Sequence, residues 1–303
     1  MSNLISTVIV AAIQASAIQC YRESEFSAHI LQLTQKAKAQ GAEIVVFPED
    51  INLWLAFVKE HPEVTLDREK RSGVSIGAMS HSPKKSRVRV YFENVTDWIL
   101  KHLHMPWLGD WLSKPKVARV CSRAFSRAAK EYSVVIVGGA YFHHDKDGLN
   151  AVCRVYDKDG SDVGGVEKHH LIPTETALGI VSGALAEPIQ TREFRIGVAI
   201  CYDINSADVC AHLAAGGAQI LCVPTSGIRP FPGYPFNPTI DMPQIERAKE
   251  TGLAVARSYQ CGWLFPGMYF DGHASIVGPN GDIKAISRSP THEQIVVAEV
   301  RLN

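Results

Sequence analysis

The chain has 303 residues, with 31 Lys plus Arg balanced by 31 Asp plus Glu, and hydrophobic residues make up 46% of it. This composition is not that of a disordered chain, and the length suffices for a large buried core without disulfide staples. The zero net charge argues against a general nucleic-acid binder, because neutralising phosphates requires excess positive charge. We therefore expect no nucleic-acid partner.

Strands and helices alternate along the first part of the chain. Residues 8–13 are apolar, but no positive charge precedes Arg22, so a buried strand fits this segment better than a signal peptide. Apolar residues recur at helical spacing in residues 24–40, and Gly41 ends that helix. The expected elements in chain order are a strand at 7–14, a helix at 24–40, a strand at 43–47, a helix at 117–132 and a strand at 134–142.

The region at about 56–116 lacks this alternation. It holds a basic stretch at 84–89, an amphipathic segment at 91–104, and Trp107 and Trp111. We interpret it as an insertion, packed as a lid over the core of a single domain that spans 1–303. The alternative is a membrane or partner contact, because aromatic and basic surfaces suit such interfaces.

The second half continues the α/β pattern. Two Asp-Gly turns, at 145–148 and 157–160, bracket a strand at 149–156. Calcium loops are not expected there, because a late bidentate Glu and flanking helices are missing from the sequence. The later expected elements are strands at 195–200, 220–223, 273–277 and 295–300, helices at 206–215 and 242–256, and a hairpin turn at 279–282.

Seven cysteines are spread over the chain without a C-x-x-C pair. This pattern is typical of reduced thiols in the cytoplasm, and it offers no zinc-ligand spacing. No segment of the sequence approaches the roughly 20 consecutive apolar residues that span a bilayer. The sequence thus favours a cytoplasmic protein without a structural metal.

Three strands end abruptly in a reactive side chain. Residues 44–48 lead to Glu49, residues 164–167 lead to Lys168, and residues 195–200 lead to Cys201. Ligands of α/β folds gather at the carboxyl ends of strands. A carboxylate, an ammonium and a thiol are therefore predicted to meet in one pocket.

Taken together, these segments resemble the nitrilase, or carbon–nitrogen hydrolase, superfamily. The matching segments follow the family's order over nearly the whole chain, apart from the insertion. They are residues 12–14 (AIQ), 47–49 (FPE), 168–171 (KHHL), 197–204 (GVAICYDI), 246–252 (ERAKETG) and 274–281 (ASIVGPNG). The resemblance implies a four-layer α-β-β-α sandwich that pairs into a homodimer and needs no cofactor or metal.

The family's catalytic triad falls on Glu49, Lys168 and Cys201. Cys201 is expected to attack the substrate carbon and form a thioester, with Glu49 as the general base for its proton. Lys168 and the backbone N–H of Tyr202 are expected to stabilise the oxyanion. Glu175 matches a second glutamate of the family and is expected to orient the site and handle protons.

Other residues near these motifs have secondary interpretations. Thr225 and Ser226 follow a strand where the family lines its substrate pocket, and the aromatic and proline-rich residues 231–238 are expected to shape the same pocket. Asp203 is expected to cap the helix that starts at Ser206, the alternative being hydrogen bonds within the turn. We expect the six cysteines other than the nucleophile to be structural, and one of the two histidines after Lys168, His170, to be a packed neighbour.

The expected reaction is hydrolysis of a small-molecule amide. Residues 47–50 (FPED) and 201–204 (CYDI) resemble the amidase, pantetheinase and biotinidase branches, whereas true nitrilases more often carry Trp-Glu after the nucleophile. Residues 246–252 also resemble the catalytic domain of apolipoprotein N-acyltransferase. The alternatives are therefore a soluble amine N-acyltransferase with the same triad, or a catalytically silent binding protein that uses its insertion. A G-x-S-x-G motif at 73–77 is rejected as a serine elbow, because charged residues precede it instead of a buried strand.

Overall fold

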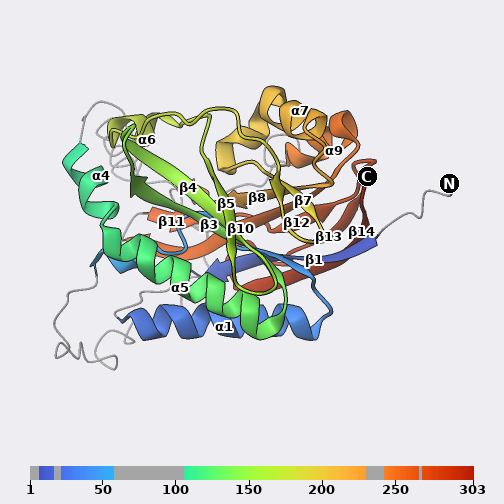
Figure 1. The fold of residues 1–303 in the computed structure, drawn as a ribbon, viewed down its shortest axis with the longest axis horizontal. Helices are drawn as coiled ribbons and strands as arrows, with labels where there is room; N and C mark the ends of the chain where they lie inside the picture. Colours follow the sequence, from blue (N-terminus) through green and yellow to red (C-terminus); the bar gives the residue numbers. More distant parts are fainter. Residues whose placement is uncertain (1–6, 17–21, 58–105, 230–241, 266–267) are drawn as a thin grey trace, which may run out of the picture.

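The computed structural model describes residues 7–16, 22–57, 106–229, 242–265 and 268–303. Two β-sheet layers lie face to face, with a pair of helices outside each (Figure 1). Helices α1 (Glu23–Ala39) and α5 (Pro115–Tyr132) cover one outer face, and α7 (Ala207–Ala215) and α9 (Gln244–Thr251) cover the other. This arrangement is the predicted α-β-β-α sandwich.

A continuous path of paired strands forms both layers. Strand β1 pairs with β14 along its length but with β10 only at residues 14–16, where one layer passes into the other. The first layer contains β1 (Thr7–Ser16), β2 (Ile44–Val46), β3 (Val135–His144), β4 (Leu149–Tyr156), β5 (Asp162–Glu167) and β14 (Gln294–Arg301). The second contains β6 (Ile189–Gln190), β7 (Arg195–Val198), β8 (Ile220–Thr225), β10 (Ala254–Phe265), β12 (Ser275–Val277) and β13 (Ile283–Ile286), and β9 (Ile228–Arg229) and β11 (Met268–Phe270) extend it.

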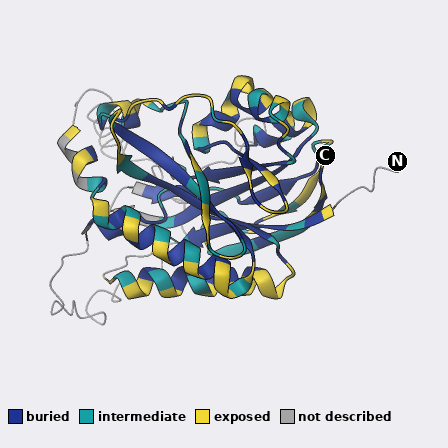
Figure 2. Cartoon of the chain, viewed as in Figure 1, coloured by how far each residue is buried: buried dark blue, intermediate teal, exposed yellow. Residues whose placement is uncertain are grey.

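Successive side chains of a strand point to opposite faces of the sheet, and this alternation divides the apolar residues between two cores. In β1, Val10 and Ala12 belong to the core between the sheets, whereas Ala11 and Ile13 pack toward α1 and α5. Central strands such as β1 and β2 are apolar on both faces because each sheet has a second layer on either side. Figure 2 shows the result, with buried strands inside and helices exposed along their outer faces. Full burial of one Val or Ile side chain contributes about 1.5–3 kcal/mol, so these faces dominate the stability of the fold.

Most predicted elements form within a few residues of their expected bounds, but the helix predicted at 242–256 is wrong in its second half. Helix α9 ends at Thr251 because Gly252 adopts the left-handed conformation, with φ of 69°. Residues 254–265 instead form β10, a 12-residue strand that pairs with both β1 and β8. The apolar run after Gly252 suits a strand buried on both faces as well as a helix, and pairing with its neighbours decides the outcome.

The insertion lies largely outside the described residues. The basic stretch, the predicted amphipathic helix at 91–104 and the rejected serine elbow at 73–77 all fall within residues 58–105, so the lid remains a prediction. On either side of this segment lie the short helices η1 (Leu53–Phe57) and α4 (Pro106–Leu112). The Lys114 ammonium donates to the Ala56 carbonyl at 3.1 Å, so the two ends of the region lie together on the core. Among the helices that the structure describes, none has the length and apolarity needed to cross a bilayer.

Candidate active site

The direction of the strands brings the predicted catalytic residues to one edge. Parallel pairings link five strands in the order β2, β1, β10, β8 and β7, so these strands run in the same direction. Strand β4 is antiparallel to both β3 and β5, so β5 runs in the same direction as β3. Strand β3 is itself parallel to β2. Glu49, Lys168 and Cys201 follow β2, β5 and β7, so their side chains enter the same region from three carboxyl ends.

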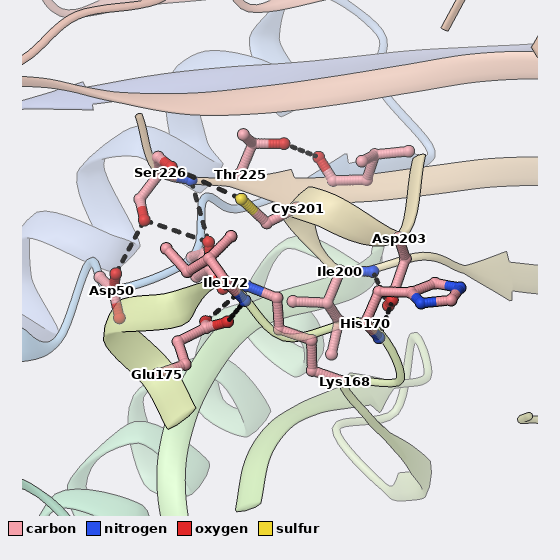
Figure 3. A network of polar contacts seen from close by, with 12 residues as sticks. Asp50, Lys168, His170, Ile172, Glu175, Ile200, Cys201, Asp203, Thr225 and Ser226 are labelled. Carbon is pink, nitrogen blue, oxygen red and sulfur yellow. Dashed lines mark hydrogen bonds and ion pairs between the residues drawn. The ribbon is translucent and has the colours of Figure 1, made fainter. Parts of the chain in front are cut away.

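A buried ammonium lies between two carboxylates at this edge. Lys168 Nζ is 2.8 Å from Glu49 Oε1 and 2.5 Å from Glu175 Oε1. Only 1% of Lys168 and 4% of Glu49 is exposed, so each charge relies on the others for compensation. Helix α6 (Pro173–Ala177) carries Glu175, whose second oxygen accepts the Ile172 N–H at 2.9 Å (Figure 3). The structure thus brings together Glu49, Lys168 and the second glutamate of the prediction.

Cys201 occupies a strained turn beside this ion cluster. Its φ of 50° lies in the left-handed region, which non-glycine residues adopt only when the surroundings enforce it. The half-buried thiol donates to the Ser226 carbonyl, with Sγ 3.5 Å from that oxygen. The sharp turn lies two residues beyond the end of β7 and places Sγ beside Ser226 (Figure 3).

The alternative for Asp203 is the correct one, and the helix-cap prediction is wrong. The Asp203 carboxylate accepts the Ile200 N–H at 3.0 Å and the His170 N–H at 2.7 Å. No side-chain hydrogen bond caps the helix at Ser206. Asp203 is buried and joins the turn of the nucleophile, η2 (Cys201–Asn205), to the loop that follows Lys168. By accepting both N–H groups, the Asp203 carboxylate fixes the turn of the nucleophile relative to the loop that follows Lys168.

Electrostatics leave the thiol protonated at rest. Burial, followed by the charge of Glu49, raises the pKa of Cys201, and the Lys168 ammonium offsets only part of this rise. Burial lowers the pKa of Lys168, but the charges of Glu49, Cys201 and Glu175 raise it well above its ordinary value. The site therefore holds a permanent cation and a thiol that needs a base before it can attack.

Ser226 follows β8, as predicted, and contacts the two carboxylates at the end of β2. Its N–H and hydroxyl lie 3.2 and 3.1 Å from Glu49 Oε2, and its hydroxyl also lies 2.7 Å from Asp50 Oδ2. These contacts make Ser226 a support for the general base, while its predicted contact with substrate stays a prediction. The Thr225 hydroxyl is buried and accepts from Arg257 Nε at 3.2 Å, so it is engaged with β10.

Two residues of the site were missed in the sequence. Asp50 has a φ of 60° and donates its N–H to the Ala140 carbonyl at 3.1 Å. Gln260 of β10 donates to the Glu49 carbonyl at 2.7 Å. A signal for Asp50 existed, since two consecutive carboxylates at a strand end are costly to bury. Gln260 carried no signal, because it lies beyond the helix predicted at 242–256, where the sequence predicts no element.

The remaining predicted residues lie around this cluster. Residues 231–238 and Cys20 lie outside the described residues, and five other cysteines are buried and free: Cys121, Cys153, Cys210, Cys222 and Cys261. Tyr202 follows the thiol with its side chain 46% exposed. Among the described residues, His169, His170 and Asp208 form a group whose candidate metal-ligand atoms all lie within 4.8 Å of one another. There His170 Nε2 is 3.0 Å from Asp208, so the pair already forms an ion pair when the imidazole is protonated.

Comparison with known proteins identifies the family of the chain. The family model for carbon–nitrogen hydrolases matches residues 9–303. An omega-amidase of Arabidopsis thaliana is 25% identical over 250 residues, which make up 78% of this chain and 65% of that protein. An omega-amidase of Homo sapiens is 26% identical over 200 residues, 62% of this chain and 68% of the relative. The chain thus spans slightly less than two thirds of the Arabidopsis relative.

Solved structures share the fold across nearly the whole chain. A carbon–nitrogen hydrolase from Helicobacter pylori G27 superposes with a TM-score of 0.69 at 20% identity, covering 97% of this chain and 89% of that one. An amidase variant from Nesterenkonia sp. AN1 gives 0.67 at 19% identity, covering 99% and 94%. That structure carries the acetamide moiety of fluoroacetamide covalently attached to its active site cysteine.

Proposed function

The chain belongs to the carbon–nitrogen hydrolase family, and we propose that it hydrolyses a small-molecule amide through a thioester on Cys201. The observation that carries the proposal is the Lys168 ammonium, held between Glu49 and Glu175 beside the half-buried thiol. A permanent cation next to a nucleophile, with a carboxylate that can take a proton, is what acyl transfer to a thiol requires. The omega-amidase relatives support an amide over a nitrile substrate.

In the first half of the reaction, Glu49 takes the proton of Cys201 as Sγ attacks the amide carbon. The carbonyl oxygen becomes an oxyanion, which the Lys168 ammonium and the Tyr202 N–H stabilise. The C–N bond then breaks, and the protonated Glu49 returns its proton to the leaving amine. The products of this half are a free amine and an acyl thioester on Cys201.

In the second half, water attacks the thioester with Glu49 again as the base. The C–S bond breaks, the acid leaves, and the Cys201 sulfur recovers its proton from Glu49. Glu175 holds the Lys168 ammonium in place with a second hydrogen bond, and the turn closed by Asp203 holds Cys201. Both halves therefore use one base and one fixed cation.

The experiment is intact-protein mass spectrometry after brief incubation with a panel of amides, esters and nitriles, followed by an acid quench. We expect an acyl adduct on Cys201 that disappears in Cys201→Ala and persists in the matched control Cys222→Ala, a buried thiol away from the ion cluster. Glu49→Gln should slow adduct formation by about 100-fold or more, the usual contribution of a general base. An adduct that persists in Cys201→Ala would contradict the proposal.

The same sample separates the alternatives. Parallel labelling with iodoacetamide reports the reactivity of Cys201 even when the panel lacks the substrate. An inert Cys201 together with no adduct would favour a binding protein on this fold. Release of an N-acylated amine in the presence of added amines would favour an acyltransferase.

A further inference from the structure

One hydroxyl proton lies between two carboxylates at the active site. Ser226 Oγ is 3.1 Å from Glu49 Oε2 and 2.7 Å from Asp50 Oδ2. Both separations are hydrogen-bond distances, but a serine hydroxyl has a single proton to donate. If Glu49 and Asp50 were both ionised, one carboxylate oxygen would face a lone pair of Ser226 without a proton between them.

A second proton at Asp50 resolves this conflict. Glu49 already receives the Lys168 ammonium at 2.8 Å and the Ser226 N–H at 3.2 Å, so its negative charge is compensated by fixed donors. Asp50 is the next residue in the chain. Among the hydrogen bonds and ion pairs of the described residues, no cation lies within hydrogen-bond distance of the Asp50 carboxyl group. Burial and the neighbouring charge of Glu49 raise the pKa of Asp50 to about 7. The donors around the two carboxylates therefore make Asp50 the better place for a second proton.

We propose that Asp50 is a positioning residue that, in its protonated form, donates to Ser226 so that Ser226 can donate to Glu49. The proposal rests on the proposed role of Glu49 as the general base. The backbone holds this relay in place, because Asp50 adopts the strained left-handed conformation and its N–H is fixed on the Ala140 carbonyl. In Figure 3, Ser226 lies between Asp50 and Cys201 and has a dashed contact to each.

The relay makes catalysis depend on the ionisation of Asp50. The groups that face it are Glu49 on its own loop, Lys168 after β5, Glu175 on α6 and the Ser226 hydroxyl after β8. When Asp50 loses its proton, it takes the hydrogen bond of Ser226, and Glu49 loses a donor. A further negative charge then lies near Cys201 and disfavours the thiolate and the oxyanion. Activity should therefore be high below the pKa of Asp50 and fall as the pH rises through it.

The test compares pH profiles of kcat/KM for the full-length enzyme with its best amide. Asp50→Asn keeps the shape and offers an N–H to Ser226 at every pH, so it should retain activity below pH 7 and lack the fall above it. The wild-type enzyme should lose about tenfold or more between its low-pH and high-pH limits, the effect of a lost hydrogen bond to a charged group. Ser226→Ala should lower kcat/KM at every pH, and Asp282→Asn, the same substitution in a remote turn, should match the wild type.

Alkylation of Cys201 by iodoacetamide provides a readout that needs no amide. The ratio of the wild-type rate to the Asp50→Asn rate should be constant at low pH and fall above pH 7. This fall in a protein that hydrolyses no amide would support the relay and refute the proposed function. The relay is overturned if Asp50→Asn keeps the wild-type profile, or if it loses as much activity as Ser226→Ala at low pH. Asp50→Asn and Ser226→Ala add no volume to the site, so both variants are expected to fold and the comparison can be made.

Discussion

Replacing Lys168 by Met tests whether the buried ion cluster is a single electrostatic unit. The substitution removes an ammonium that lies 2.8 Å from Glu49 and 2.5 Å from Glu175, while the aliphatic stem is largely preserved. Both carboxylates are buried, with 4% and 7% of each residue exposed, so neither can turn to water. Removing one partner of a buried ion pair destabilises a protein by about 3–5 kcal/mol.

The loss should appear as a lower melting temperature that depends on pH. At about 2–4 °C per kcal/mol for a large domain, the expected fall in melting temperature is roughly 6–20 °C at pH 8. The fall should be smaller at pH 5, because protonation of the two unpaired carboxyl groups relieves their repulsion. Lys168 itself keeps its charge over this range, since its pKa is raised well above the ordinary value.

Differential scanning fluorimetry at both pH values measures this effect. Lys284→Met is the matched control, because it removes a lysine that pairs with Asp282 at the surface, where 42% and 50% of the two side chains are exposed. That variant should melt within a degree or two of the wild type, as expected for an exposed pair of about 0–1 kcal/mol. Adding Glu175→Gln to the Lys168 variant should recover part of the loss. An equal fall in melting temperature at pH 5 and pH 8 would refute the electrostatic explanation, as would a double variant that melts no higher than Lys168→Met.

Three other substitutions probe the same site. Asp203→Asn should lower the free energy of unfolding, measured in urea, by about 1–3 kcal/mol and should slow alkylation of Cys201. The reason is that the amide oxygen accepts only one of the two N–H groups that the carboxylate holds. An unchanged free energy of unfolding would mean that the turn does not depend on Asp203. Glu175→Gln should lower kcat by about tenfold or more with little change in KM, since it weakens the hold on Lys168 in the transition state; a rise in KM alone would assign Glu175 to substrate binding. Lys168→Arg should fail to restore acylation in the mass assay, because a guanidinium has a different shape and donor geometry; an adduct at the wild-type rate would contradict this.

Local sequence was enough to predict much of the fold. Segments of apolar residues bounded by glycines and Asp-Gly turns predicted most strands, and the spacing of apolar residues in 24–40 predicted α1. The positions of Glu49, Lys168 and Cys201 after strands also predicted a shared edge, since strand direction alone determines where carboxyl ends meet. Periodicity failed at residues 254–256, because an apolar run buried on both faces has no period that separates helix from strand.

The identities of the residues at the strand ends thus determined, by themselves, which functional groups would meet. Only the tertiary structure decided how these groups bond to one another. Ser226 lies 177 residues from Glu49 and 176 from Asp50 in the chain, and it reaches both carboxylates because β2 and β8 end at the same edge. Asp203 bonds across 33 residues to His170 for the same reason. A hydrogen bond depends on distances of a few tenths of an ångström and on competition for single protons, and neither is encoded in the spacing of residues along the chain.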